Sequence, residues 1–117
     1  YLFHDHPMER DPQIKTYADR KDDQGVFMAY CEHAYDYMMA NQAQSPLRLV
    51  MFSMLEKPDL YKNHFQNRKL KGIKVLEDYI SSRINDGVFR TVEPFHVAMA
   101  FYSMVTQLLI DAMTLGT

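Results

Sequence analysis

Few side chains in this sequence combine a reactive type with a spacing that would let them act together. Cys31 and His33 are two positions apart on a predicted helix, so their side chains point in different directions. His33 and Asp36 are three positions apart and can meet, but no nucleophile joins them. We interpret Cys31 as a small buried side chain and His33 as a surface or rim residue. We therefore predict no catalytic residues and no enzyme activity.

Two further pairs have the spacing of metal ligands. His4 and His6 flank Asp5, but such a pair near a terminus is typical of solvent-exposed chain. Glu93 and His96 form a single Glu-x-x-His motif, whereas a carboxylate-bridged metal bundle needs two such motifs and two further glutamates. We predict no metal and no cofactor, and we keep a carboxylate-bridged metal bundle as the least favoured hypothesis for the function.

The composition indicates one globular domain without a nucleic-acid-binding surface of its own. The chain has 117 residues, 47% of them hydrophobic, and a net charge of −2. A single cysteine excludes an internal disulfide and fits a reducing, cytoplasmic location. Residues 97–110 form the most apolar stretch, and its 14 uncharged positions are fewer than the roughly 20 that a membrane span needs. We therefore expect no membrane association. We also expect no signal peptide, because residues 1–25 carry charges throughout and have no apolar core.

Hydrophobic periodicity predicts an all-α fold, a bundle of about four to five helices. We expect an irregular lead-in or short helix over residues 1–25, with the short helix at 14–20, and then a helical domain over 26–117. The longer helices are expected at 24–42, 46–57, 59–86 and 94–115. Pro46 and Pro94 stand at first helical positions, Ser45 is a good N-cap, and Pro58 and Gly87 end the helices before them.

Two helices have too many apolar residues for an ordinary amphipathic stripe. The helix at 46–57 has almost no polar face, which predicts that it is buried among its neighbours. The helix at 94–115 is apolar around most of its circumference, so a second copy of the chain is expected to cover one side. Gly72, within the long third helix, indicates either a close helix approach or a kink.

The order of turn signatures from residue 45 to 115 resembles the regulatory domain of TetR/AcrR-type bacterial transcription regulators. In that family an apolar sixth helix is followed by an x-Pro-Asp/Glu-Leu step into a long helix with an early aromatic, here Phe65. That helix ends in a glycine-containing turn and is followed by a Val-Asp-Pro entry to the eighth helix. The corresponding segments here are Lys57-Pro58-Asp59-Leu60, Ile84-Asn85-Asp86-Gly87-Val88-Phe89-Arg90 and Val92-Glu93-Pro94.

The resemblance implies a C-terminal ligand-binding and dimerisation domain. Its expected partners are a small apolar or amphipathic effector and a second copy of the chain. DNA would be bound only through a separate N-terminal helix-turn-helix, which this sequence lacks, as it lacks the family's last helix. A helical protein-interaction or scaffold domain without a ligand is the alternative.

Aromatic and methionine side chains on the inner helix faces are the candidates for the effector site. We predict that the following residues line it: Phe27, Tyr30, Cys31, Tyr35, Met38, Phe52, Leu55, Phe65 and Tyr102. For the dimer interface we choose one side of the last helix, helped by the outer side of the long third helix. The interface residues are Val97, Phe101, Met104, Val105 and Leu108.

Overall fold

The computed structural model describes residues 7–40 and 46–115, and every regular element within these ranges is a helix. A short 3-10 turn at Met8–Arg10 opens the described chain, and a π-helical turn at Lys62–Gln66 joins two of the helices. The α-helices are α1 Pro12–Asp19, α2 Asp23–Met38, α3 Pro46–Glu56, α4 Pro58–Tyr61, α5 Asn67–Asn85 and α6 Pro94–Leu115. The expected all-α class and both ends of the last helix are confirmed.

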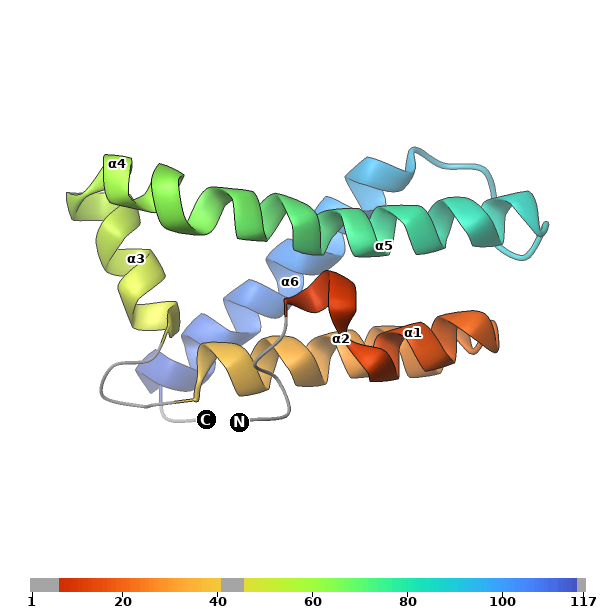
Figure 1. The fold of residues 1–117 in the computed structure, drawn as a ribbon, viewed down its shortest axis with the longest axis horizontal. Helices are drawn as coiled ribbons and strands as arrows, with labels where there is room; N and C mark the ends of the chain where they lie inside the picture. The colour runs from red at the N-terminus through yellow and green to blue at the C-terminus, as the bar shows by residue number, and fades with distance from the viewer. Residues whose placement is uncertain (1–6, 41–45, 116–117) are drawn as a thin grey trace.

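The helices are arranged around a core between α2, α5 and α6. Figure 1 shows α4, the π-helical turn and α5 as one long rod, with α1 and α2 running antiparallel on the other side and α6 crossing behind. The main buried cluster contains Ile14, Val26, Ala29, Tyr30, Ile73, Leu76, Tyr79, Ile80 and Ala98. A second cluster, Leu47, Val105 and Leu109, joins α3 to the end of α6.

Two aspartates near the start of the described residues cap successive helices. Asp11 caps α1 by accepting hydrogen bonds from the backbone N–H groups of Gln13 (2.8 Å) and Ile14 (3.1 Å). Asp22 caps α2 by accepting from the backbone N–H of Gly25 at 3.0 Å. Ile14 is buried, so the short helix within the expected lead-in contributes directly to the core. His4, His6 and Ser45 lie outside the described residues.

Gly25 lets α1 and α2 pack closely, and this predicts a specific loss of stability. A Cβ atom at Gly25 would lie 2.4 Å from the Tyr17 ring, whereas a Cβ at Gly72 would meet only the Tyr30 hydroxyl at 3.5 Å and Met8 at 3.9 Å. We expect Gly25→Ala to lower the free energy of unfolding by about 1–3 kcal/mol because the Tyr17 ring must move. The matched Gly72→Ala should be neutral or stabilising by up to about 1 kcal/mol. Urea unfolding of both variants would measure this, and equal stabilities would contradict it.

The expectation that α3 is buried on all sides is wrong. Leu47 and Ser53 are its buried residues, whereas the side chains of Leu49, Phe52, Met54 and Leu55 are more than half exposed. One side of α3 packs against α6 and α2, and the other side faces outward because no element of the described chain covers it. α3 therefore has more apolar side chains than the described part of a single chain buries.

The long third helix predicted at 59–86 is interrupted by the π-helical turn. It ends as expected at Gly87, whose φ of 79° lies in the left-handed region. The Val88 N–H donates to the Arg83 carbonyl (3.1 Å) and the Gly87 N–H to the Ile84 carbonyl (2.9 Å), the pattern of a Schellman turn. The first long helix is shorter than expected and ends at Met38 instead of residue 42.

α6 has two unlike faces. Ala98, Val105 and Leu109 are buried, whereas Val97, Met104, Leu108 and Leu115 are exposed along one stripe. By length and composition α6 resembles a membrane span, with a mean hydropathy of 1.3 and 17% of the apolar window buried. A core or interface helix of a protein without any membrane segment has the same length and composition. The exposed stripe is consistent with the predicted contact between two copies of the chain.

Candidate functional site: an apolar cavity with a cationic wall

A cavity of about 70 Å³ lies between α2, α3, α5 and α6, beside the π-helical turn. Its wall is mainly aromatic and aliphatic, with a few polar groups among them, which is the usual composition of a small-molecule site. The lining residues are Met8, Tyr30, His33, Ala34, Tyr37, Met38, Val50, Tyr61, Phe65, Arg68, Lys69, Gly72, Tyr102, Val105, Thr106 and Leu109.

Two tyrosines contribute neutral hydroxyl groups to this wall. Tyr30 is almost fully buried, and its hydroxyl donates to the Gly72 carbonyl at 3.1 Å, which joins α2 to α5. Burial raises the pKa of Tyr30 well above its ordinary value, and burial also raises the pKa of Tyr102. Both groups therefore stay protonated at neutral pH and act as hydrogen-bond donors. Gly72, for which the sequence indicated either a close helix approach or a kink, accepts the Tyr30 hydrogen bond through its backbone carbonyl.

Two cationic side chains line the same wall, and each lies over the face of a tyrosine ring. The guanidinium carbon of Arg68 lies 4.0 Å from the centroid of the Tyr37 ring on α2, and the Lys69 Nζ lies 5.5 Å from the Tyr102 ring on α6. Arg68 and Lys69 are half-buried and adjacent on α5. The cation–π contacts hold these long side chains at the cavity instead of leaving them extended into solvent.

His33 is buried, so its interpretation as a surface or rim residue is wrong. Its Nδ1 atom lies 2.5 Å from the Oδ2 atom of Asp11, and both side chains are 2% exposed. Burial alone would raise the pKa of Asp11, but hydrogen bonds from His33 and from the Ile14 and Gln13 backbone lower it below its ordinary value. His33 therefore joins the cap of α1 to the wall of the cavity.

The structure brings some of the predicted effector residues together and separates others. Tyr30, Met38, Phe65 and Tyr102 line the cavity. Phe27 packs in the main core against Tyr79 and Phe101, and Cys31 is half-buried beside Leu47, Val105 and Leu109. Tyr35, Phe52 and Leu55 are exposed on α2 and α3, away from the cavity. Burial raises the pKa of the Cys31 thiol, which therefore stays protonated at neutral pH.

Sequence reasoning missed several lining residues, chiefly His33, Tyr37, Tyr61, Arg68 and Lys69. A short basic run such as Arg68-Lys69-Leu70-Lys71 is, by its sequence alone, typical of a solvated helix face. A sequence signal did exist, because Tyr61, Phe65, Arg68, Lys69 and Gly72 follow steps of three and four residues along one helix face. Hydrophobic periodicity alone favours apolar positions and therefore passes over cations within such a face.

The predicted interface residues also separate into two groups. Val97, Met104 and Leu108 are exposed on one stripe of α6. Phe101 is partly buried and packs its ring against Phe27 at a centroid distance of 5.1 Å. Val105 is 6% exposed and belongs to the second core cluster, since it points roughly 80° around the helix from the exposed stripe.

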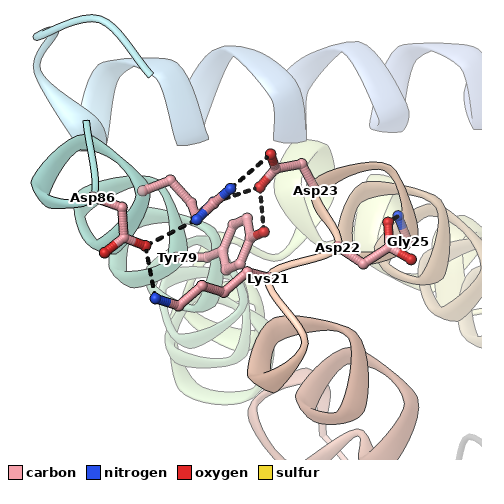
Figure 2. Close-up of polar contacts among 7 residues, drawn as sticks. Lys21, Asp22, Asp23, Gly25, Tyr79 and Asp86 are labelled. Carbon is pink, nitrogen blue, oxygen red and sulfur yellow. Dashed lines mark hydrogen bonds and ion pairs between the residues drawn. The ribbon is translucent and has the colours of Figure 1, made fainter. Parts of the chain in front are cut away.

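A separate polar cluster connects the α1–α2 turn to the end of α5 through hydrogen bonds and ion pairs. The Arg83 Nε donates to Asp23 Oδ1 at 2.8 Å and its Nη1 donates to Asp86 Oδ2 at 2.9 Å, while the Tyr79 hydroxyl also donates to Asp23. Lys21 Nζ lies 3.4 Å from Asp86 Oδ2. Figure 2 shows these groups converging between the two elements. Each charge has an opposite partner, so the cluster has a structural role.

Acidic pH is expected to weaken this polar cluster. Hydrogen bonds from Arg83 lower the pKa of Asp23 and of Asp86 in the folded chain. A carboxylate with a lowered folded pKa stabilises the fold above its unfolded pKa of about 4, and this contribution is lost as the pH falls through the folded value. We therefore expect urea stability to fall below about pH 4 and the fall to be shallower in Asp23→Asn. The exposed Asp19→Asn is the control, and an unchanged acid limb in Asp23→Asn would contradict the assignment.

The described chain has no obvious centre for metal or covalent chemistry. Among residues 7–40 and 46–115, no group of three or more His, Cys, Asp or Glu side chains is placed to hold a metal ion. Glu93 accepts a hydrogen bond from the Phe95 backbone N–H at 3.4 Å, and His96 is exposed. Asp11 lies beside His33, but Cys31 belongs to a different cluster.

Comparison with known families identifies the fold. A model of the C-terminal domain of AefR-like transcriptional repressors, a TetR-type family, matches residues 7–117. This chain belongs to that family. Searches among curated proteins and among solved structures gave no match. The TetR-type resemblance predicted from the turn signatures is therefore confirmed, and the match extends to the segment before residue 26. The AefR-like domain is the regulatory part of a transcriptional repressor family, whose members are generally not enzymes.

Proposed function

We propose that this AefR-like domain senses a small apolar or amphipathic molecule in the cavity and forms the homodimer of its regulator in the cytoplasm. DNA would be bound by a separate helix-turn-helix, and the domain itself would have no enzymatic activity. The observation that carries the proposal is an apolar cavity between four helices whose wall includes tyrosine hydroxyls and two cations.

α6 supplies a direct route from the cavity to a second copy of the chain. Tyr102, Val105 and Leu109 face the cavity, whereas Met104 and Leu108 are exposed on another side of the same helix. A ligand that displaces α6 would change the angle at which the two copies meet. Such a ligand shifts DNA binding only if its affinity differs between the two arrangements.

The volume of the cavity favours a second candidate function. About 70 Å³ is well below the 300 Å³ or more of typical small-molecule pockets, as expected of a nearly filled core. A helical interaction domain without a ligand would have this property. In the sensing proposal, Met8 and Met38 must move to admit the effector, which suits the flexibility of methionine.

Native mass spectrometry of the chain as purified, gentle enough to keep dimers and bound molecules, is the first test. A dimer carrying extra mass supports sensing, a dimer without extra mass favours the interaction domain, and a monomer overturns the proposed interface. The variant Ala34→Leu fills the cavity and should lose the extra mass. The exposed Ala40→Leu should keep it.

A further inference from the structure

We propose that the effector is a lipophilic organic anion, with its apolar body in the cavity and its charged head between Arg68 and Lys69. This inference rests on the proposed sensing function and specifies the chemical class of the ligand. It follows from the charges on the wall, from their placement and from what surrounds them.

The charge on the cavity wall has one sign. Arg68 and Lys69 line it, and no aspartate or glutamate side chain is among the lining residues of the described chain. Asp11 contacts the lining residue His33, and its carboxylate also accepts hydrogen bonds from two backbone N–H groups. A cationic ligand would therefore meet two like charges without a compensating carboxylate.

The two cations have no carboxylate partner among the described residues. Ion pairs there are made by Lys15, Lys21, Lys74 and Arg83 instead. The partners of Arg68 and Lys69 are the faces of Tyr37 and Tyr102, which orient a cation but leave its N–H groups able to donate. Half-buried cations in this state gain strongly from a ligand anion, because charge-assisted hydrogen bonds are about twice as strong as neutral ones.

Their placement fits one ligand head with an apolar body behind it. Arg68 reaches toward α2 and Lys69 toward α6, so the two cations flank the space between those helices. Met38, Phe65 and Leu109 on the same wall offer apolar contact for the body. Phe65 belongs to the π-helical turn just before Arg68, and such turns occur frequently at functional sites.

The test compares ligands that share one alkyl chain and differ in the head. Octanoate, octyl phosphate, octan-1-ol and octyltrimethylammonium would each be titrated into the full chain by isothermal calorimetry, below their micelle concentrations. We expect both anions to bind at least about tenfold more tightly than the alcohol, and the cation to bind most weakly. Comparison of the two anions distinguishes a carboxylate from a phosphate head.

Charge-removing variants assign the preference to its residues. The double variant Arg68→Met/Lys69→Met should lose the anion preference and keep the affinity for octan-1-ol, which also shows that the cavity is still folded. Lys71→Met, an exposed position on the same helix, removes one charge without touching the cavity and should keep the preference.

The outcomes separate this inference from the sensing proposal. Equal binding of all four heads, or a preference that survives in the double variant, overturns the anionic ligand while the cavity remains a ligand site. Failure of every octyl compound to bind, with the chain folded, overturns the sensing function itself.

Discussion

Leu108→Glu is expected to abolish the proposed homodimer and to leave a folded monomer. Leu108 and Met104 on α6 are 60% and 51% exposed, so the substitution removes no contact within one chain. In a two-fold interface each substitution is present twice, and burying an unpaired carboxylate against apolar side chains costs several kcal/mol. We expect dimerisation to weaken by at least about a hundredfold.

Sedimentation velocity over a range of concentrations would measure this change, and circular dichroism would show that the helices remain. The matched control is Leu55→Glu on α3, which adds the same charge at an apolar position that is 80% exposed. The interface assignment fails if Leu108→Glu remains as dimeric as the unchanged chain, or if Leu55→Glu dissociates it equally.

The geometry of α6 is the reason that we propose this stripe as the interface. Val97, Phe101, Met104, Leu108 and Leu115 follow steps of four, three, four and seven residues, which keeps them within roughly 40° of one line along the helix. Ala98, Val105 and Leu109 lie roughly 100° away and fill the core. The sequence prediction assigned both Val105 and Leu108 to the interface, although these two residues lie on different faces of α6.

The sequence predicted the helices well because their ends are local. Pro46, Pro58 and Pro94 each occupy the first position of a helix, and Gly87 has the positive φ that a Schellman turn requires. The π-helical turn at Lys62–Gln66 was not predictable in this way. Its sequence, Lys-Asn-His-Phe-Gln, contains no proline or glycine that would mark a local change of helix type.

The cavity was harder to predict because its wall combines faces of several helices. The pattern of apolar residues in a helix indicates which face of that helix is buried. It does not indicate whether another helix or a cavity lies against that face. Phe27 and Tyr30 are three positions apart on α2, and Phe27 packs in the core whereas Tyr30 also lines the cavity. The contact between Asp11 and His33 spans 22 positions, so no local pattern indicates it.

Asp11→Ala is expected to destabilise this domain strongly, and more than Gly25→Ala does. The variant removes two N-cap hydrogen bonds of α1 and the carboxylate that holds the buried ring of His33. Losing a cap costs about 1 kcal/mol, and leaving a buried hydrogen-bonding group without its partner costs about 1–3 kcal/mol. The sum of about 2–4 kcal/mol is a substantial part of the 5–15 kcal/mol by which domains are usually stable, so thermal unfolding should show a clearly lower midpoint.

A double-mutant cycle separates the cap from the buried pair. If the contact with His33 dominates, Asp11→Ala/His33→Leu should be more stable than the sum of the single effects predicts by at least about 1 kcal/mol, because removing both polar partners leaves neither buried alone. Additive effects within about 0.5 kcal/mol would instead assign the loss to the cap. Because His33 also lines the cavity, the same coupling would connect an incoming ligand to the segment that begins α1. An effect of octanoate on the stability of Asp11→Asn that differs from its effect on the unchanged chain would measure this connection.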